Sequence, residues 1–207
     1  NDADVQYVSI DRPISPTLDS AARASHAGIA AQYGVTGKNI GVAILDSGID
    51  EHDDLERVVY KESFLTGNNT TDEFGHGTHI AGIIAGDGDA SSGDGSFFTL
   101  KGVAPGVSLI NLRVLDANGQ GTDSAVIAAI DRAIQLKSRY NIRVINLSLG
   151  RPVFESYTRD PLCQAVERAW KAGIVVVVAA GNQGRNNAAG TNGYGTIQSP
   201  ANDPYVI

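Results

Sequence analysis

Short runs of apolar residues alternate along this chain with longer segments of helical periodicity. The apolar runs, which predict buried strands, are residues 41–46, 108–114, 143–149 and 174–179. The helical segments that follow strands are residues 76–86, 122–137 and 160–171. Strands that are apolar on both faces need cover on both faces, and alternating strands and helices favour parallel pairing. The pattern therefore predicts an α/β fold in which helices cover both faces of a mostly parallel sheet.

Size and charge narrow the classes of function. The 207 residues suit one domain with a sizeable core. A formal net charge of −7 without any basic run argues against nucleic acid as a partner, because phosphate binding needs clustered Lys and Arg. No stretch reaches the roughly 18 apolar residues of a membrane span. The single cysteine, Cys163, excludes an intrachain disulfide, and its place on a predicted helix favours an apolar core residue.

Two glycine-containing motifs hold the residues with the clearest chemistry. Asp46 ends the first predicted strand and is followed by Ser-Gly, whereas His76 opens a predicted helix within Gly-His-Gly-Thr-His. Taken singly, Asp46 also suits a helix cap, and His76 suits a capping or core histidine. Both lie where open α/β sheets place their sites, and an Asp–His pair activates a hydroxyl nucleophile. Together they predict a hydrolase.

Two further motifs complete a family pattern. They are Asn146-Leu-Ser-Leu-Gly150 and Ala179-Ala-Gly-Asn182. In their order and spacing, the four motifs resemble the subtilisin-like serine proteases (subtilases, peptidase family S8), over about residues 30–207. The resemblance implies a three-layer subtilisin-like fold. It also implies hydrolysis of peptide bonds through an Asp-His-Ser triad and an acyl-enzyme.

The resemblance assigns roles to individual residues. Asp46 orients the imidazole of His76, which is the general base toward a serine and then the general acid toward the leaving amine. The side-chain amide of Asn182 donates a hydrogen bond to the oxyanion of the tetrahedral intermediate. No cofactor is needed for catalysis of this kind.

A polypeptide substrate is expected to bind as an extended strand between two segments of the chain, through main-chain hydrogen bonds. By resemblance, these segments and the pocket for the side chain before the cut comprise Gly119, Gln120, Gly121, Ser148, Leu149, Gly150, Ala179, Gly181 and Gln198. Gln198 falls near the base of the pocket, and Ser199-Pro200 matches a cis-proline at its rim. We expect the pocket to accept large apolar or neutral polar side chains rather than acidic ones.

The nucleophile itself is not among these motifs. The family carries its serine in a Gly-Thr-Ser segment, which this sequence lacks. The resemblance therefore divides the chain into an N-terminal arm or propeptide tail, 1–16, and an incomplete catalytic domain, 17–207. It implies two partners: a C-terminal fragment of the same protein that carries the serine, and an inhibitory propeptide. It also implies a secreted protein whose signal peptide has been removed.

Structural calcium is the one metal that the resemblance suggests. Asp54 matches a position that binds calcium in some family members, and the loop 87–95 holds three carboxylates among glycines. The loop does not fit an EF-hand, because Ser92 stands where that motif needs glycine and Phe98 where it needs glutamate. A solvated acidic loop and a flexible surface loop are the simpler interpretations of these segments.

Two other functions fit parts of the pattern. A non-catalytic subtilase-like fragment, or pseudoprotease, would act as a binding module, but it has no need for Asp46, His76 and Asn182 together. A nucleotide-binding α/β protein would also carry glycine-rich loops after its strands. The chain has neither Gly-x-Gly-x-x-Gly between strand and helix nor a P-loop lysine motif, so peptide hydrolysis is favoured.

Overall fold

The computed structural model describes residues 26–185, 187–190 and 195–207, which contain a five-stranded parallel sheet. The strands are β1 (Gly41–Asp46), β2 (Val58–Ser63), β3 (Ser108–Arg113), β4 (Ile142–Leu147) and β5 (Val175–Val178). They lie in the order β2-β3-β1-β4-β5, and every pairing is parallel. The α-helices are α2 (Ala27–Gln32), α3 (His76–Ala85), α4 (Asp123–Tyr140) and α5 (Pro161–Lys171).

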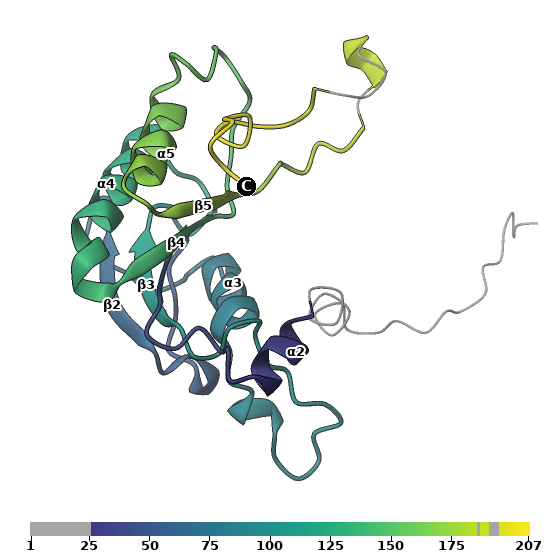
Figure 1. The fold of residues 1–207 in the computed structure, drawn as a ribbon. Helices are drawn as coiled ribbons and strands as arrows, with labels where there is room; N and C mark the ends of the chain where they lie inside the picture. Colours follow the sequence, from purple (N-terminus) through teal and green to yellow (C-terminus); the bar gives the residue numbers. More distant parts are fainter. Residues whose placement is uncertain (1–25, 186, 191–194) are drawn as a thin grey trace, which may run out of the picture.

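Helices cover both faces of the sheet, as Figure 1 shows. α4 and α5 pack against each other and against one face, where the larger hydrophobic core forms. α3 covers the other face and shares a smaller core with β1 and β3. β1 serves both cores, because Ala43 and Leu45 enter the larger one and Val42 and Ile44 the smaller one. The predicted three-layer α/β fold is confirmed.

The topology opens one edge of the sheet for a site. β1 lies at the centre, with β3 and β2 on one side of it and β4 and β5 on the other. The strands run parallel, so that Asp46 at the end of β1 lies opposite Arg113 at the end of β3. Where the connections from neighbouring strands run to opposite sides of a parallel sheet, a crevice forms beyond the carboxyl ends of the strands. The residues that follow β1, β3, β4 and β5 therefore meet at this edge.

The sequence pattern does not predict β2. Among the residues that the structure describes, β3 is its one partner strand, so β2 lies at the side of the sheet, and none of its own residues is fully buried. Its sequence, Val-Val-Tyr-Lys-Glu-Ser, lacks the continuous apolar run of the inner strands. An edge strand with solvent on several sides has no need of such a run, which explains the omission.

The four other strands and the helices α3, α4 and α5 match the predicted segments and differ from them at their ends. α4 continues to Tyr140 and stops at Asn141, whose φ of 47° is left-handed. The Thr122 hydroxyl caps the start of α4 by accepting a hydrogen bond from a backbone N–H of the first turn. Asp160 caps α5, and Pro161 occupies its first position.

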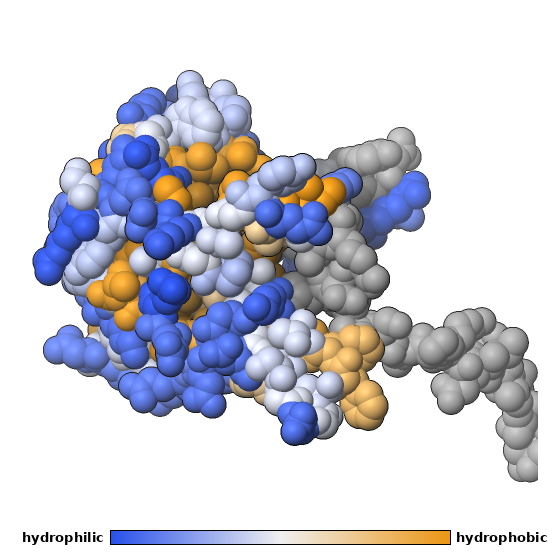
Figure 2. Space-filling model, turned by 60° about the horizontal axis from the view of Figure 1, so that its bottom comes forward, coloured by the Kyte–Doolittle hydropathy of each residue, from blue (hydrophilic) through white to orange (hydrophobic). Residues whose placement is uncertain are grey.

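One face of the molecule is mostly polar (Figure 2). On the face that Figure 2 brings forward, hydrophilic residues cover most of the area and apolar residues gather in patches between them. Phe97 and Phe98, in the loop between α3 and β3, are among the exposed apolar side chains. None of the helices within the described ranges combines the length and hydropathy that crossing a membrane requires. The predicted N-terminal arm, 1–16, lies outside the described residues.

Candidate active site

Asp46 and His76 lie side by side at the carboxyl edge of the sheet. Asp46 is the last residue of β1 and is 1% exposed, whereas His76 is the first residue of α3. The His76 Nδ1 atom is 2.8 Å from Asp46 Oδ1 and 3.0 Å from Asp46 Oδ2. A carboxylate only accepts hydrogen bonds, so Nδ1 is the donor in this contact, and in the neutral imidazole Nε2 is then the acceptor. This arrangement prepares the imidazole to take a proton from a hydroxyl.

The start of α3 is fixed by Asp72, which sequence reasoning missed. Its carboxylate accepts hydrogen bonds from the Gly75 N–H, the Thr78 N–H and the Thr78 hydroxyl, each at 2.7 Å. Burial alone would raise the pKa of Asp72, but hydrogen bonds from Thr78, Ser47 and the backbone outweigh burial and lower that pKa. Asp72 therefore stays ionised and holds the helix start that carries His76. Its only signal in the sequence is its place just ahead of the histidine motif.

A close approach of α3 to the end of β1 brings the pair together. The Gly77 N–H donates to the Ser47 hydroxyl at 3.0 Å. A Cβ built on Gly77 would lie 2.1 Å from the carbonyl oxygen of Gly48, which no real side chain tolerates. Only glycine permits this contact, which explains the glycine that follows His76.

A cleft of about 560 Å³ opens beside His76. All the predicted substrate-binding residues and the predicted oxyanion donor line it: Gly119, Gln120, Gly121, Ser148, Leu149, Gly150, Ala179, Gly181, Asn182 and Gln198. Asp46 is buried and bonded to the imidazole. The structure thus brings the four sequence motifs to one place. Phe74 and Arg151 also line the cleft, although sequence reasoning did not single them out.

One wall of the cleft is the turn from Asp116 to Gly121. The Asp116 carboxylate accepts hydrogen bonds from the Gln120 N–H at 2.9 Å and the Asn118 N–H at 2.8 Å. These two bonds lower the pKa of Asp116. Within the turn, Gly119 has a φ of 71° and leaves no room for a Cβ beside the ring of Phe74. The turn therefore presents its backbone to the cleft in a fixed conformation.

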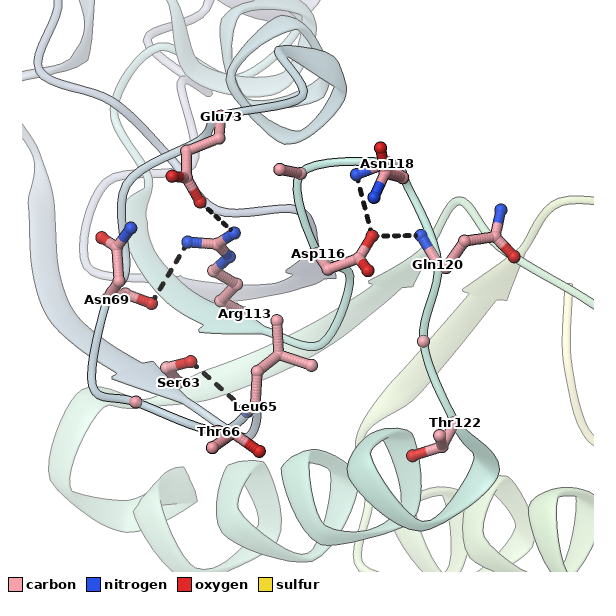
Figure 3. A pocket seen from close by; sticks show the side chains of 13 residues that line it. Ser63, Leu65, Thr66, Asn69, Glu73, Arg113, Asp116, Asn118, Gln120 and Thr122 are labelled. Atoms are coloured by element: carbon pink, nitrogen blue, oxygen red, sulfur yellow. Dashed lines mark hydrogen bonds and ion pairs between the residues drawn. The ribbon is translucent and has the colours of Figure 1, made fainter.

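A second cavity, of about 630 Å³, lies on the other side of this turn and is drawn in Figure 3. The buried guanidinium of Arg113 is part of its lining and lies between Asn69 and Glu73. It donates to the Glu73 carboxylate at 2.7 Å and to the Asn69 carbonyl at 3.4 Å. Its Nε donates to the Leu115 carbonyl at 3.1 Å. Arg113 therefore joins the segment leading to His76 to the base of the turn.

Another part of the cleft lining, called here the slot, is formed by Gly150, Gly181 and Gln198. A Cβ built on Gly150 would be 3.0 Å from Gln198 Oε1, and one built on Gly181 would be 2.9 Å from Gln198 Cγ. The Gln198 N–H donates to the Ala180 carbonyl at 3.0 Å. The following Ser199–Pro200 peptide is cis, as the resemblance implies. The Gln198 side chain therefore lies close to both Gly150 and Gly181, and its place at the base of a pocket stays a prediction.

The predicted calcium segments contain carboxylates that already serve the backbone. The Asp54 carboxylate accepts a hydrogen bond from the Ala90 N–H at 2.8 Å, and the Asp87 carboxylate accepts one from the Asp89 N–H at 3.2 Å. Within the part of the chain that the structure describes, no group of three or more His, Cys, Asp or Glu residues is placed to hold a metal ion. Structural calcium at Asp54 therefore stays a prediction.

Several known proteins are similar to this chain in sequence. A model of the subtilase family matches residues 37–207. The serine protease AprX of Bacillus subtilis (strain 168) is 37% identical, over 99% of this chain and 46% of its own length. Subtilisin DY of Bacillus licheniformis is 43% identical, over 78% of this chain and 54% of its own length. The minor extracellular protease Epr of Bacillus subtilis (strain 168) is 35% identical, over 73% of this chain and 21% of its own length.

The chain spans about half the length of AprX and of subtilisin DY. The family match covers all five strands and every residue that lines the cleft. The resemblance found in the four motifs is confirmed, and the chain belongs to the subtilase family.

Proposed function

We propose that this chain is part of a serine endopeptidase that cleaves peptide bonds through an acyl-enzyme. The observation that carries the proposal is the 2.8 Å contact between Asp46 and His76 beside a cleft lined by the predicted substrate segments. In this proposal, the serine comes from a segment of the same protein after residue 207. A C-terminal fragment with that serine is the expected partner if the protein is cut at this point.

The proposed chemistry uses both nitrogens of the imidazole. Nδ1–H of His76 donates to Asp46, while Nε2 takes the proton of the serine hydroxyl as that oxygen attacks the peptide carbonyl. Asp46 stabilises the imidazolium that forms, and His76 then gives the proton to the leaving amine. Asn182, on the same cleft, is the proposed donor to the oxyanion. Loss of such a donor lowers kcat about 10²- to 10³-fold, a magnitude established on a subtilisin.

The proposed substrate is an extended polypeptide. It would pair with Gly119–Gly121 on one side and Ser148–Gly150 on the other, where glycines let a second backbone come close. The slot beside Gln198 would receive the side chain before the cut. Its neutral carboxamide favours apolar and neutral polar side chains. Acidic ones are disfavoured, because the nearby Arg151 is already paired with two carboxylates.

The remaining proposals concern the whole protein. We infer a secreted enzyme, in keeping with the relative that is named an extracellular protease. An inhibitory propeptide and structural calcium are proposed from the family resemblance. No cofactor takes part in the proposed catalysis.

The test is labelling of the full-length protein with a fluorophosphonate probe, followed by mass spectrometry of its peptides. We expect one labelled serine, in a segment after residue 207, and hydrolysis of unstructured polypeptides. His76→Ala should abolish both, because the serine then lacks its base. A folded protein without label would instead support the alternative, a pseudoprotease that binds peptides.

A further inference from the structure

Arg151 directly follows the Ser148–Gly150 segment and lines the cleft. Its Nη2 atom lies 2.8 Å from Asp123 Oδ2 and 2.8 Å from Asp160 Oδ1. The side chains of Arg151, Asp123 and Asp160 are 21%, 42% and 0% exposed. Asp123 opens α4 and Asp160 caps α5. The arginine therefore joins the first turns of both helices to the edge of the cleft.

A second set of hydrogen bonds leads from Asp160 back to the arginine. The other oxygen of Asp160 accepts a hydrogen bond from the Ser199 hydroxyl at 2.8 Å. The Ser199 N–H donates to the Arg151 carbonyl at 2.8 Å, and the Arg151 N–H donates to the Ser199 carbonyl at 3.0 Å. Arg151, Asp160 and Ser199 therefore form a closed ring of hydrogen bonds, called here the Arg151 ring.

The Arg151 ring lies next to two residues that line the cleft, Gly150 and Gln198. Gly150 precedes Arg151, and Gln198 precedes Ser199, so both are covalently joined to members of the ring. A Cβ built on Gly150 would be 3.0 Å from the Gln198 side chain and 3.1 Å from the Ser199 carbonyl oxygen. At such contact distances, a small loosening of the ring changes the width of the slot.

The ring also satisfies the charge that it buries. Burial alone would raise the pKa of Asp160, but hydrogen bonds from Ser199, Arg151 and a backbone N–H outweigh burial and lower that pKa. The phenyl group of Phe154 lies over the guanidinium, and the centroid of this aromatic group is 5.6 Å from Arg151 Cζ. Removal of the arginine would leave a wholly buried carboxylate without its cation.

We propose that Arg151 is a positioning residue, which acts through Asp160 and Ser199 to fix the slot for the substrate side chain before the cut. The inference rests on the peptidase function proposed above. The guanidinium is held by two carboxylates and has no contact with the Asp46–His76 pair. Its contribution is therefore to discrimination between side chains, and the proton transfers at His76 do not depend on it directly.

The same two helices offer a matched control. Arg168 of α5 and Asp131 of α4 form an ion pair at 3.0 Å, with side chains 47% and 45% exposed. Neither residue lines the cleft. Removing this pair also deletes an Arg–Asp contact between α4 and α5, but it leaves the slot untouched, and exposed pairs contribute little to stability.

The test compares Arg151→Met, Arg151→Lys and Arg168→Met in the full-length enzyme, with peptides that differ only in the residue before the cut. For the residue that the wild type prefers, Arg151→Met should lower kcat/KM about 10- to 100-fold. For glycine, which places no side chain in the slot, the loss should stay below about threefold. Arg151→Lys should restore part of the selectivity, because lysine keeps the charge but lacks the planar fork. Arg168→Met should change neither value.

A second measurement does not depend on activity. Hydrogen exchange of the Ser199 amide should accelerate about tenfold or more in Arg151→Met and stay unchanged in Arg168→Met. Asp123→Asn, which leaves the buried Asp160 paired, should give a smaller change of the same kind and serves if Arg151→Met fails to fold. Equal losses of kcat/KM for glycine and the preferred residue, or unchanged exchange at Ser199, would overturn the proposal. Absence of cleavage by both wild type and Arg168→Met would overturn the peptidase function, while the exchange data would still decide whether the ring holds the slot.

Discussion

Gly77→Ala should displace His76 from its carboxylate partner without touching the substrate segments. The new Cβ would lie 2.1 Å from the Gly48 carbonyl oxygen, well inside the 3.0 Å that real Cβ atoms respect. The new Cβ is fixed to the backbone of α3, and the oxygen that it meets belongs to the backbone of the turn after β1. No flexible side chain can therefore move to relieve the contact. The helix must therefore move by about 1 Å, and the imidazole of His76 moves with it.

Two magnitudes follow from this displacement. Forcing an extra carbon into a packed contact costs about 1–3 kcal/mol of unfolding free energy. A misplacement of about 1 Å in a catalytic group lowers the rate by up to about 10²-fold. We expect kcat to fall about 10- to 100-fold, with little change in KM, because the segments Gly119–Gly121 and Ser148–Gly150 stay in place. Initial rates on a peptide substrate and urea unfolding of the full-length enzyme measure both quantities.

Gly82→Ala is the control on the same helix. A Cβ built on Gly82 meets nothing within 4 Å. Alanine there should leave kcat unchanged and stabilise the protein by about 0.5–1 kcal/mol, because glycine loses more backbone entropy on folding. If Gly77→Ala matched Gly82→Ala in both rate and stability, the reasoning from the close approach of α3 to β1 would be refuted.

Three further outcomes are expected. Asp46→Asn should lower kcat about 10⁴-fold in the full-length enzyme, because an amide favours the wrong tautomer of its histidine partner. Steady-state rates would measure this loss, and circular dichroism would check that the fold persists. The Cys163 thiol, whose pKa burial raises to about 11, should react with an aromatic disulfide reagent only after the protein unfolds, and fast reaction of the native protein would contradict this. Burial and the nearby Glu167 raise the pKa of Asp203 in the folded protein. The contribution of Asp203 to stability is therefore present below the pKa of the unfolded chain, and it is lost as the pH rises through the pKa of the folded protein. Asp203→Asn should therefore stabilise the protein by about 1 kcal/mol at pH 7 and by less near pH 4, as thermal unfolding would show.

The inner sheet and the contact between Asp46 and His76 were predictable because they depend on local signals. The strand Gly41–Asp46 is buried on both faces. Such a continuous apolar run is typical of an inner strand that has neighbouring strands on both sides and helices over both faces. Its final acid and the glycines around His76 mark a strand end and a helix start, and parallel topology brings such ends together. The cleft-lining motifs were predictable for another reason, the family resemblance, and the subtilase match confirms the family although the roles of single residues stay predictions.

The missed residues act through contacts that no local pattern reveals. Asp72 stabilises the start of α3 from outside the helix, where standard capping patterns do not look. Arg113 is the last residue of β3, and Arg151 directly follows Gly150. At the end of an apolar segment, an arginine is ordinarily solvated. The partners of these two arginines come from distant parts of the chain, such as Glu73 for Arg113 and Asp123 for Arg151. Such ion pairs exist only once the fold has formed, so the sequence alone does not indicate them.

If Asp46 and His76 act as proposed, activity should be lost more easily than the fold, because the two residues belong to different layers. Asp46 ends the central strand, whereas His76 belongs to α3, which buries only Gly77, Ala81 and Ala85. Units that bury little apolar surface open before the rest of a protein unfolds. Detachment of α3 would separate imidazole from carboxylate while the sheet, α4 and α5 persist. Inactivation by heat or denaturant should therefore precede the loss of secondary structure, and it should be reversible until the larger core opens.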